Sequence, residues 1–162
     1  MDRTEAEQLA RKLMHKWKCE DWTFKWSHGK RQLGAAAIVK ERSTGKILRR
    51  ELRLSRYLVD LNDLPEVQDT ILHEIAHIKA GLENGHNEVW KRWCVKVGAK
   101  PERCYDDDQV NVIPPKYLVV CQSCNRILAK RMRRTRSMKR AYCKHCGPST
   151  QGKLEYQLNQ QQ

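Results

Sequence analysis

The stretch His73-Glu74-Ile75-Ala76-His77 decides how the rest of the chain is interpreted, and His86 follows it nine residues later. Histidines four residues apart project from one face of an α-helix, because four residues make slightly more than one turn. Two imidazoles on one face can bind one zinc ion, with His86 as the candidate third ligand and a fourth position left for water. Glu74 is then placed to act on that water as a general base and not as a ligand. The pattern predicts a catalytic zinc site.

The two histidines are expected on the exposed side of a central helix. Their helix carries apolar residues at steps of three or four, which form one narrow stripe: Val67, Ile71, Ile75, Ile78 and Leu82. His73 and His77 lie on nearly the opposite side, so burial of the stripe leaves them facing a cleft.

A helix break after this stripe is expected to bring the third ligand into place. Gly81 and Gly85 end the central helix, and a second helix is expected from about residue 86 to 97. A tight turn between the two helices would return His86 toward the first two histidines. Glu83 and Glu88 are the weaker alternatives for the third ligand.

The residues before the central helix predict one helix and three strands. Thr4 and Glu7 have the spacing of a capping box, ahead of an amphipathic pattern over residues 4–18. Alternating and β-branched residues predict strands over 22–26, 33–40 and 47–55. Because turn signals separate the strands, we expect a three-stranded antiparallel meander with one face buried.

A change of composition marks a boundary between two domains. Residues 109–154 contain eleven Lys or Arg and no Asp or Glu, and Pro114-Pro115 has the character of a linker. We therefore expect a domain over residues 1–113 and a basic domain with a short polar tail over 114–162. The acidic run Asp106-Asp107-Asp108 just before the boundary is expected to be a solvated loop.

Two pairs of cysteines in the second domain predict a structural zinc site. Cys121 and Cys124 form one C-x-x-C pair, Cys143 and Cys146 form the other, and 18 residues separate the pairs. This is zinc-ribbon spacing. Four thiolates complete the tetrahedron and leave no position for water, so this zinc is expected to be structural. A redox dithiol is the alternative for either pair.

Cations gather between the two cysteine pairs and predict binding to nucleic acid. The chain carries 32 Lys and Arg against 19 Asp and Glu, for a formal net charge of +13, which favours a polyanionic partner. The expected phosphate-contacting residues are Arg126, Lys130, Arg131, Arg133, Arg134, Arg136, Lys139 and Arg140. Tyr117 and Tyr142 are candidates to stack on exposed bases. DNA, single-stranded or with single-stranded character, is the expected partner, and a solvated basic loop is the alternative.

Cysteine usage and hydropathy predict a cytoplasmic, intracellular protein. Seven cysteines, four of them in C-x-x-C pairs, favour metal binding in a reducing compartment over disulfides. The first residues are charged and contain no apolar signal core, and no apolar run approaches the length of a membrane span.

The order of these motifs resembles the SprT-like (Spartan) zinc metalloprotease family. The resemblance is carried by the runs 70–77 and 85–92, the strands around Leu33-Gly34 and Leu52–Ser55, and the two cysteine pairs, and it covers about residues 22–155. It implies an α+β fold: a small zincin-like (minigluzincin) domain with the three-stranded antiparallel sheet and the H-E-x-x-H helix, followed by the zinc ribbon.

The same resemblance implies a function in DNA–protein crosslink repair. It implies two zinc ions, one catalytic and one structural, and proteolysis of DNA-bound or crosslinked proteins that DNA switches on. His73, His77 and His86 would be the catalytic ligands and Glu74 the acid/base. The chain departs from the family at Asn87-Glu88-Val89, where members often have Gly-Pro-Glu. Without long tails, a compact bacterial or phage-type, nucleoid-associated member is expected.

Two other functions fit the same residues. One is a nucleic-acid-binding zinc-ribbon regulator whose protease site is vestigial, although a purely structural site would have no need of Glu74. The other is a zinc hydrolase that acts on a substrate other than a peptide, which only a substrate assay separates from a protease.

Overall fold

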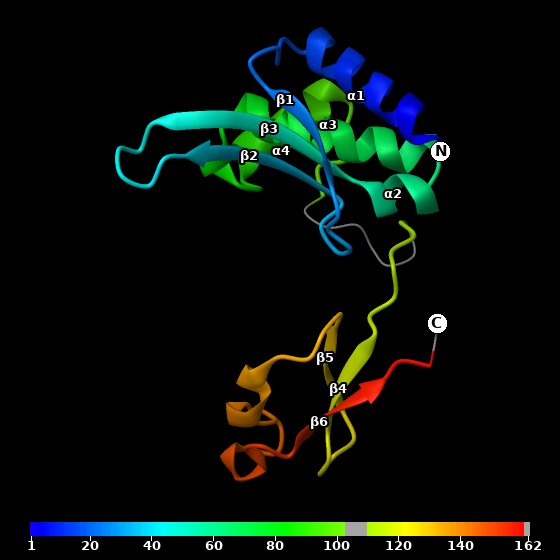
Figure 1. Cartoon of the computed structure of the whole chain (residues 1–162), viewed down its shortest axis with the longest axis vertical. Helices are drawn as coiled ribbons and strands as arrows, with labels where there is room; N and C mark the ends of the chain where they lie inside the picture. The colour runs from blue at the N-terminus through cyan, green and yellow to red at the C-terminus, as the bar shows by residue number, and fades with distance from the viewer. Residues whose placement is uncertain (103–109, 161–162) are drawn as a thin grey trace. The chain divides into compact units, whose positions relative to one another are not determined.

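The computed structural model describes residues 1–102 and 110–160, without the side chain of Lys139. Asp106-Asp107-Asp108 lies outside the described residues. The chain forms two compact units, Met1–Ile113 and Pro114–Gln162, and the prolines at 114 and 115 begin the second (Figure 1). Both units mix small three-stranded sheets with helical segments, which makes the chain an α+β protein.

The first unit consists of one sheet and a set of helices. Its elements are, in order, α1 (Arg3–Lys16), β1 (Thr23–Ser27), β2 (Gly34–Lys40), β3 (Ile47–Ser55), α2 (Arg56–Leu61), α3 (Leu64–Ala80), the 3₁₀ turn η1 (Leu82–Asn84) and α4 (Glu88–Val97).

The sheet of the first unit is not the antiparallel meander that the sequence predicted. Its strand order is β1-β3-β2: β2 pairs with β3 in antiparallel fashion, whereas β1 runs parallel to β3. The segment after β1 is therefore not a hairpin, since it passes the end of β3 to reach the far edge of the sheet. Ser55, the last residue of β3, holds this crossing: its hydroxyl donates to Gly29 O at 2.7 Å, and its N–H donates to Leu33 O at 2.8 Å. The turn-forming residues after β1 indicate that the chain turns, but they do not indicate that it passes the end of β3.

The core of the first unit lies between the sheet and the helices α1, α3 and α4 (Figure 1). The helix α3 contacts β2, α1 and α4. The first three residues of its predicted stripe, Val67, Ile71 and Ile75, are fully buried. Leu52 and Leu54 of β3 are also fully buried. Burial of this stripe sets the rotation of α3 about its own axis, and so it sets where the histidines point.

Two helix starts differ from the sequence expectation. Asp2, not Thr4, is the N-cap of α1, because its carboxylate accepts the N–H groups of Thr4 and Glu5. The helix α4 starts at Glu88 with Asn87 as its N-cap, so His86 precedes the helix. At the other end of α4, Gly98 adopts the expected left-handed conformation, with φ 87°.

The second unit is a three-stranded antiparallel sheet with two short 3₁₀ turns. It contains β4 (Tyr117–Cys121), β5 (Ile127–Arg131), η2 (Arg136–Arg140), η3 (Pro148–Thr150) and β6 (Leu154–Leu158), in the sheet order β5-β4-β6. Few apolar side chains are buried in it; Val119 and Val120 are the buried valines among its described residues. A unit with so small a core needs a further source of stability.

Within the described residues, no helix has the length and apolar character that crossing a membrane requires.

Two asparagines, Asn62 and Asn111, join the last residues of the first unit to the end of α2 by hydrogen bonds. Asn62 is buried, and its side-chain amide donates to Leu58 O at 2.9 Å and to Asn111 O at 2.8 Å. The side-chain carbonyl of Asn62 accepts the backbone N–H of Asn111 at 2.7 Å. The side-chain amide of Asn111 donates to Leu61 O at 3.1 Å. These bonds attach the segment around residue 111 to the end of α2.

We expect Asn62→Ala to destabilise the first unit by about 2–3 kcal/mol, because it leaves buried backbone groups without partners. Urea unfolding followed by tryptophan fluorescence measures the change, since all five tryptophans lie within residues 1–113. Asn111→Ala removes only the bond to Leu61 and keeps the backbone bonds to Asn62, so it should cost less than about 1 kcal/mol. Equal losses in the two variants would contradict this account.

Candidate metal centre and active site

The helix α3 places two of the predicted histidines side by side. His73 and His77 are half-buried on its face away from the apolar stripe. Their ring centroids are 5.1 Å apart. The four-residue spacing thus produces the pair that the sequence predicted.

The break after α3 brings His86 to this pair. Gly81 and Gly85 both have positive φ, 88° and 52°, and they flank η1. His86 Nε2 lies 3.2 Å from His77 Nε2, and one ring nitrogen from each of the three histidines lies within 4.8 Å of the others. Two nitrogens bound to one tetrahedral zinc at its usual bond length are about 3.3 Å apart. The three imidazoles therefore fit a shared zinc ion.

Side-chain amides hold the turn that carries His86. The Asn84 amide donates to Ala80 O at 2.7 Å, at the end of α3, and its carbonyl accepts from the Asn87 amide at 3.0 Å. The Asn87 carbonyl accepts the N–H groups of Val89 and Trp90 at the start of α4. A continuous chain of hydrogen bonds thus connects the two helix ends across His86. Asn87 acts here as a helix cap, at the position where the sequence departs from the family pattern.

Trp90 of α4 forms the floor of the histidine cluster. Its ring centroid lies 4.8 Å from that of His73, 5.2 Å from that of His77 and 4.6 Å from that of His86. Its plane is stacked on His77, with an interplanar angle of 26°. Trp90 is fully buried, and its indole N–H finds no acceptor among the residues that the structure describes. One rigid ring therefore supports all three candidate ligands.

Glu74 points from α3 toward the strand β2 and is buried. Its carboxylate accepts the backbone N–H of Ala36. A Cβ atom on Gly34 would lie 2.8 Å from Glu74 Cγ and 2.9 Å from Thr70 Cγ2, which is closer than real Cβ contacts allow. The missing side chain at Gly34 is what lets β2 approach Glu74.

Burial shifts the pKa values of the cluster in opposite directions. Burial, with a smaller effect from His86, lowers the pKa of His73 to about 4. Burial, with smaller effects from the other two histidines, lowers the pKa of His77 to about 4. Burial also raises the pKa of Glu74 to about 7, against the opposing effect of the Ala36 N–H. At neutral pH both imidazoles are thus unprotonated, which is the form that binds a metal ion.

The carboxylates proposed as alternative third ligands lie outside the cluster. Glu88 is exposed and pairs with Lys91 at 2.7 Å, while Glu83 packs against Gly81. Within the part of the chain that the structure describes, the His-containing group that could hold a metal consists of the three histidines alone.

The four cysteines of the second unit also come together. One sulfur from each of Cys121, Cys124, Cys143 and Cys146 lies within 4.8 Å of the others, and Cys124 Sγ is 3.8 Å from Cys143 Sγ. Sulfurs on one tetrahedral zinc are about 3.8 Å apart. The Asn125 N–H donates to Cys121 O, and the Gly147 N–H donates to Cys143 O. The residues that follow the two pairs, Asn125 and Gly147, both have positive φ, 55° and 86°. This geometry fits a zinc ribbon.

Backbone N–H groups stabilise a thiolate in this cluster. Burial acts to raise the pKa of Cys121, but the N–H groups of Ser123 and Cys124 outweigh it and lower that pKa to about 7. A hydrogen bond with Cys124, followed by burial, raises the pKa of Cys146 to about 12. Cys121 is therefore more readily deprotonated than Cys146.

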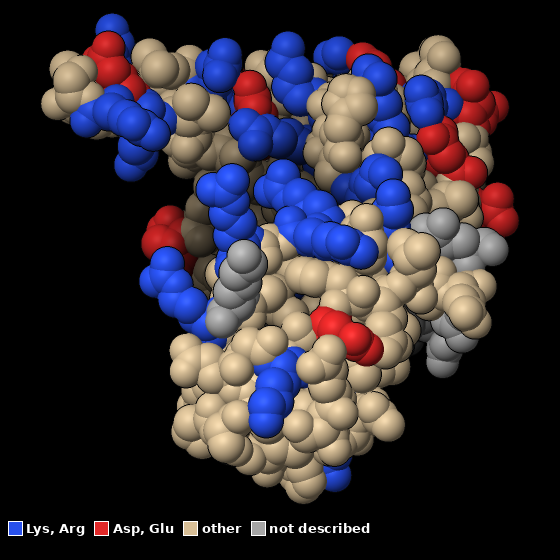
Figure 2. Space-filling model, turned by 60° about the horizontal axis from the view of Figure 1, so that its bottom comes forward, with Lys and Arg blue, Asp and Glu red and all other residues tan. Residues whose placement is uncertain are grey.

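The predicted nucleic-acid-binding cations are exposed, but they are not confined to one hairpin. Seven of the eight are exposed and lie before β5, on β5, in the following loop and on η2: Arg126, Lys130, Arg131, Arg133, Arg134, Arg136 and Arg140. The eighth, Lys139, lies on η2, and its side chain is outside the described atoms. The Arg134 guanidinium lies 5.2 Å from the centroid of the Tyr117 ring. In the face shown in Figure 2, Lys and Arg side chains gather in the upper part of the view, whereas the lower part is mostly uncharged.

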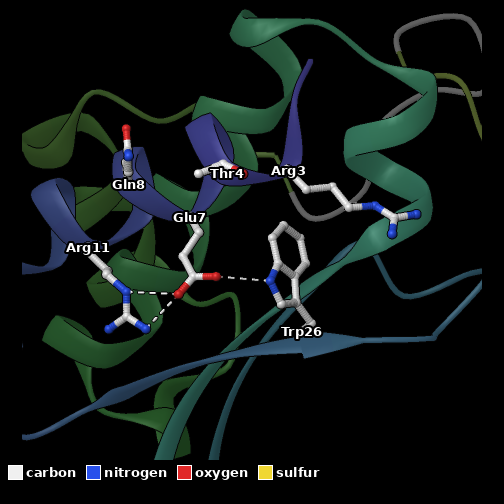
Figure 3. A pocket seen from close by; sticks show the side chains of 6 residues that line it. All are labelled: Arg3, Thr4, Glu7, Gln8, Arg11 and Trp26. Carbon is white, nitrogen blue, oxygen red and sulfur yellow. Dashed lines mark hydrogen bonds and ion pairs between the residues drawn. The ribbon is translucent and has the colours of Figure 1, made fainter.

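A separate hollow lies between α1 and Trp26 of β1 (Figure 3). Glu7 points into it and accepts from the Arg11 guanidinium and from the Trp26 indole N–H, at 3.1 Å from the latter. Glu7 is thus engaged across the hollow and makes no capping box with Thr4. Arg3, at one side, is paired with Asp60. The charged groups here satisfy one another, so the hollow supplies no group for chemistry.

Sequence reasoning missed three supports of the site. These supports are the Trp90 ring, the space left by Gly34, and the side-chain amides of Asn84 and Asn87. The N-cap position of an asparagine before an amphipathic helix is a usable signal for Asn87. No local signal places Trp90 under the histidines, because that contact depends on the angle between α3 and α4.

The comparisons with known proteins agree with this geometry. The model of the SprT-like family matches residues 4–111. No curated protein matches the chain.

We expect the pH dependence of the unfolding free energy of the metal-free protein to report the ionisation of Glu74. Its pKa is about 7 when folded and near 4.5 when unfolded, so the wild type loses about 3 kcal/mol from this group as the pH rises through that interval. Glu74→Gln cannot ionise and avoids the loss. In urea unfolding of chelator-treated protein, the stability of Glu74→Gln relative to wild type should rise between pH 4.5 and 7.5.

The histidine contributions cancel in this comparison, because both proteins carry them. Glu83→Gln is the matched control, and its stability relative to wild type should not change with pH in the same way. A pH-independent difference between Glu74→Gln and wild type would contradict the burial of an ionisable Glu74.

We expect Trp90→Ala to weaken zinc binding at the histidines by about 10- to 100-fold, because the rings lose their shared support. After dialysis against a weak chelator, wild type should keep about two zinc ions per chain and Trp90→Ala about one. Trp93→Ala, on the same helix but outside the histidine cluster, is the matched control and should keep both. Equal zinc contents in the three proteins would exclude a role for Trp90 in shaping the site.

Proposed function

The chain belongs to the SprT-like family, and from this premise we propose that its first unit is a zinc-dependent endopeptidase of zincin-like (minigluzincin) architecture. The observation that carries the proposal is the cluster of His73, His77 and His86, with Glu74 beside the first of them. Three imidazoles and one adjacent carboxylate are the residue set of a catalytic zinc site that keeps one position open.

The proposal gives each residue of the cluster a task. The three histidines hold zinc, supported by Trp90. Zinc bound there would supply a Lewis acid for a peptide carbonyl and make a water molecule more acidic. Glu74 accepts a proton from the attacking water and delivers it to the leaving amine. Without a metal ion, burial raises the pKa of Glu74 to about 7, so the group can hold or release a proton near neutral pH.

The approach of β2 fixes the position of this acid/base. The Ala36 N–H holds one side of the Glu74 carboxylate, and Gly34 provides the space for it. A carboxylate held by a strand loses little further freedom when the substrate binds, which is the condition for efficient proton transfer.

For the second unit we propose a structural zinc ribbon that binds DNA. The four cysteines would hold the metal, and the exposed cations from Arg126 to Arg140 would contact phosphates. Proteins bound or crosslinked to DNA are then the proposed substrates, and DNA, in single-stranded form, is the proposed activator. The function is DNA–protein crosslink repair.

Cleavage of a DNA-binding protein by the purified chain, with and without single-stranded DNA, tests the proposal. We expect cleavage that DNA stimulates, and Glu74→Gln should slow it by about 100-fold or more, because the general base is lost. Glu83→Gln is the matched control and should keep wild-type activity.

The outcomes separate the competing functions. DNA binding without cleavage by any of these proteins would refute the protease and favour a regulator with a vestigial site. Equal cleavage with and without DNA would keep the peptidase but remove the proposed activating role of DNA.

A further inference from the structure

The charges of the first unit are separated between its sheet and its helices. Residues 22–56, which contain the three strands, carry ten Lys or Arg and two Asp or Glu. The other described residues of this unit, 1–21, 57–102 and 110–113, carry ten Lys or Arg and thirteen Asp or Glu. A basic sheet region is therefore joined to an acidic helical region, even though the unit as a whole is close to neutral.

The register of the sheet places part of this charge on the face away from the helices. Phe24, Leu52 and Leu54 point into the core, so the residues alternating with them point outward. Lys25 on β1 lies directly beside Arg53 on β3. Arg53 and Arg49 also pair with the buried Glu51, which partly neutralises them and holds both guanidinium groups over the sheet.

The hairpin between β2 and β3 reaches beyond the helices (Figure 1), so both of its faces are open there. It carries Lys40, Arg42 and Lys46, all exposed. None of these three makes an ion pair with any residue in the described ranges 1–102 and 110–160. Ile47 and Leu48 beside them are 40% and 55% exposed. Unpaired cations next to exposed aliphatic side chains suit a partner that has both phosphates and accessible bases.

We propose that the β2–β3 hairpin and the outer sheet face form a second nucleic-acid-binding surface, separate from the ribbon. This hairpin surface is defined by Lys40, Arg42 and Lys46 on the hairpin and by Lys25, Arg49 and Arg53 on the outer sheet face. Its partner is single-stranded nucleic acid. The cations contact phosphates, and the aliphatic pair contacts sugars and bases.

The position of the hairpin surface links it to the catalytic glutamate. The strand β2 starts with Gly34 and Ala36 against Glu74 and ends at Lys40. Lys40 lies four residue steps along the strand from Ala36, which is about 13 Å. Nucleic acid on the hairpin surface would thus hold an attached protein within reach of the active site. This link rests on the proposed function, whereas the binding itself does not.

The test compares two triple variants that remove the same charge. Lys40→Gln/Arg42→Gln/Lys46→Gln neutralises the hairpin, and Lys12→Gln/Lys16→Gln/Arg92→Gln neutralises three exposed cations on α1 and α4. Binding of a fluorescent single-stranded oligonucleotide to the full chain is measured over a range of salt concentrations. The hairpin variant should bind about 10-fold more weakly and lower the salt slope by about 2, because each phosphate contact adds about 0.7. The helix variant should match wild type.

Lysine acetylation of the wild-type chain provides a second measurement that needs no variant. Bound oligonucleotide should protect Lys40 and Lys46 from acetylation and leave Lys12 and Lys16 reactive. Both experiments read binding without cleavage, so they give the same answer whether or not the chain is a peptidase.

Three results would overturn the inference. The first is equal weakening by both triple variants, which would indicate an effect of overall charge. The second is equal protection of all four lysines. The third is a hairpin variant that keeps oligonucleotide binding but loses binding to polyglutamate, since the surface would then recognise acidic protein.

Discussion

The close approach of β2 to α3 is the constraint on which the first unit depends. Gly34 leaves no room for a side chain between the strand and Glu74, and the Ala36 N–H meets the Glu74 carboxylate. With the strand in this place, the apolar stripe of α3 enters the core and the two histidines of α3 turn outward. The same contact therefore positions the acid/base, the metal ligands and the edge of the sheet. It also ties the strand that continues into the basic hairpin to the catalytic helix.

A single physical cause, burial, prepares the site for a cation. Burial lowers the pKa of His73 and His77 to about 4 and raises that of Glu74 to about 7, so each group moves toward its neutral form. A bound divalent cation would stabilise the ionised form of the Glu74 carboxylate. The unprotonated nitrogens of the histidines would supply the lone pairs that coordinate it. Burial therefore leaves the nitrogens of His73 and His77 unprotonated and available to a metal ion.

The two units are stabilised in different ways. The first has a continuous core between sheet and helices, with Trp90 fully buried at its centre. The second buries few apolar side chains but gathers four cysteines. Metal binding by those thiols would supply the folding free energy that its small core cannot. The second unit can therefore carry many exposed cations on its surface.

The sequence by itself determined the parts of this protein that depend on local periodicity and spacing. A four-residue step places His73 and His77 together, a glycine-rich break returns His86, and two C-x-x-C pairs gather four thiols. Residues that tolerate positive φ, such as Asn125 and Gly98, were recognisable from their type and position. Each of these features is decided within a few turns of chain, where sterics and helix geometry leave little choice.

Only the tertiary structure decided the features that join distant segments. The parallel pairing of β1 with β3 depends on a crossing held by Ser55, and turn residues look the same whether a chain crosses a strand or reverses beside it. Trp90 meets the histidines because α4 packs on α3 at a particular angle, and Gly34 meets Glu74 because β2 occupies the edge of the sheet. These contacts are set by how whole elements pack, and packing is a property of the assembled core that no local pattern encodes.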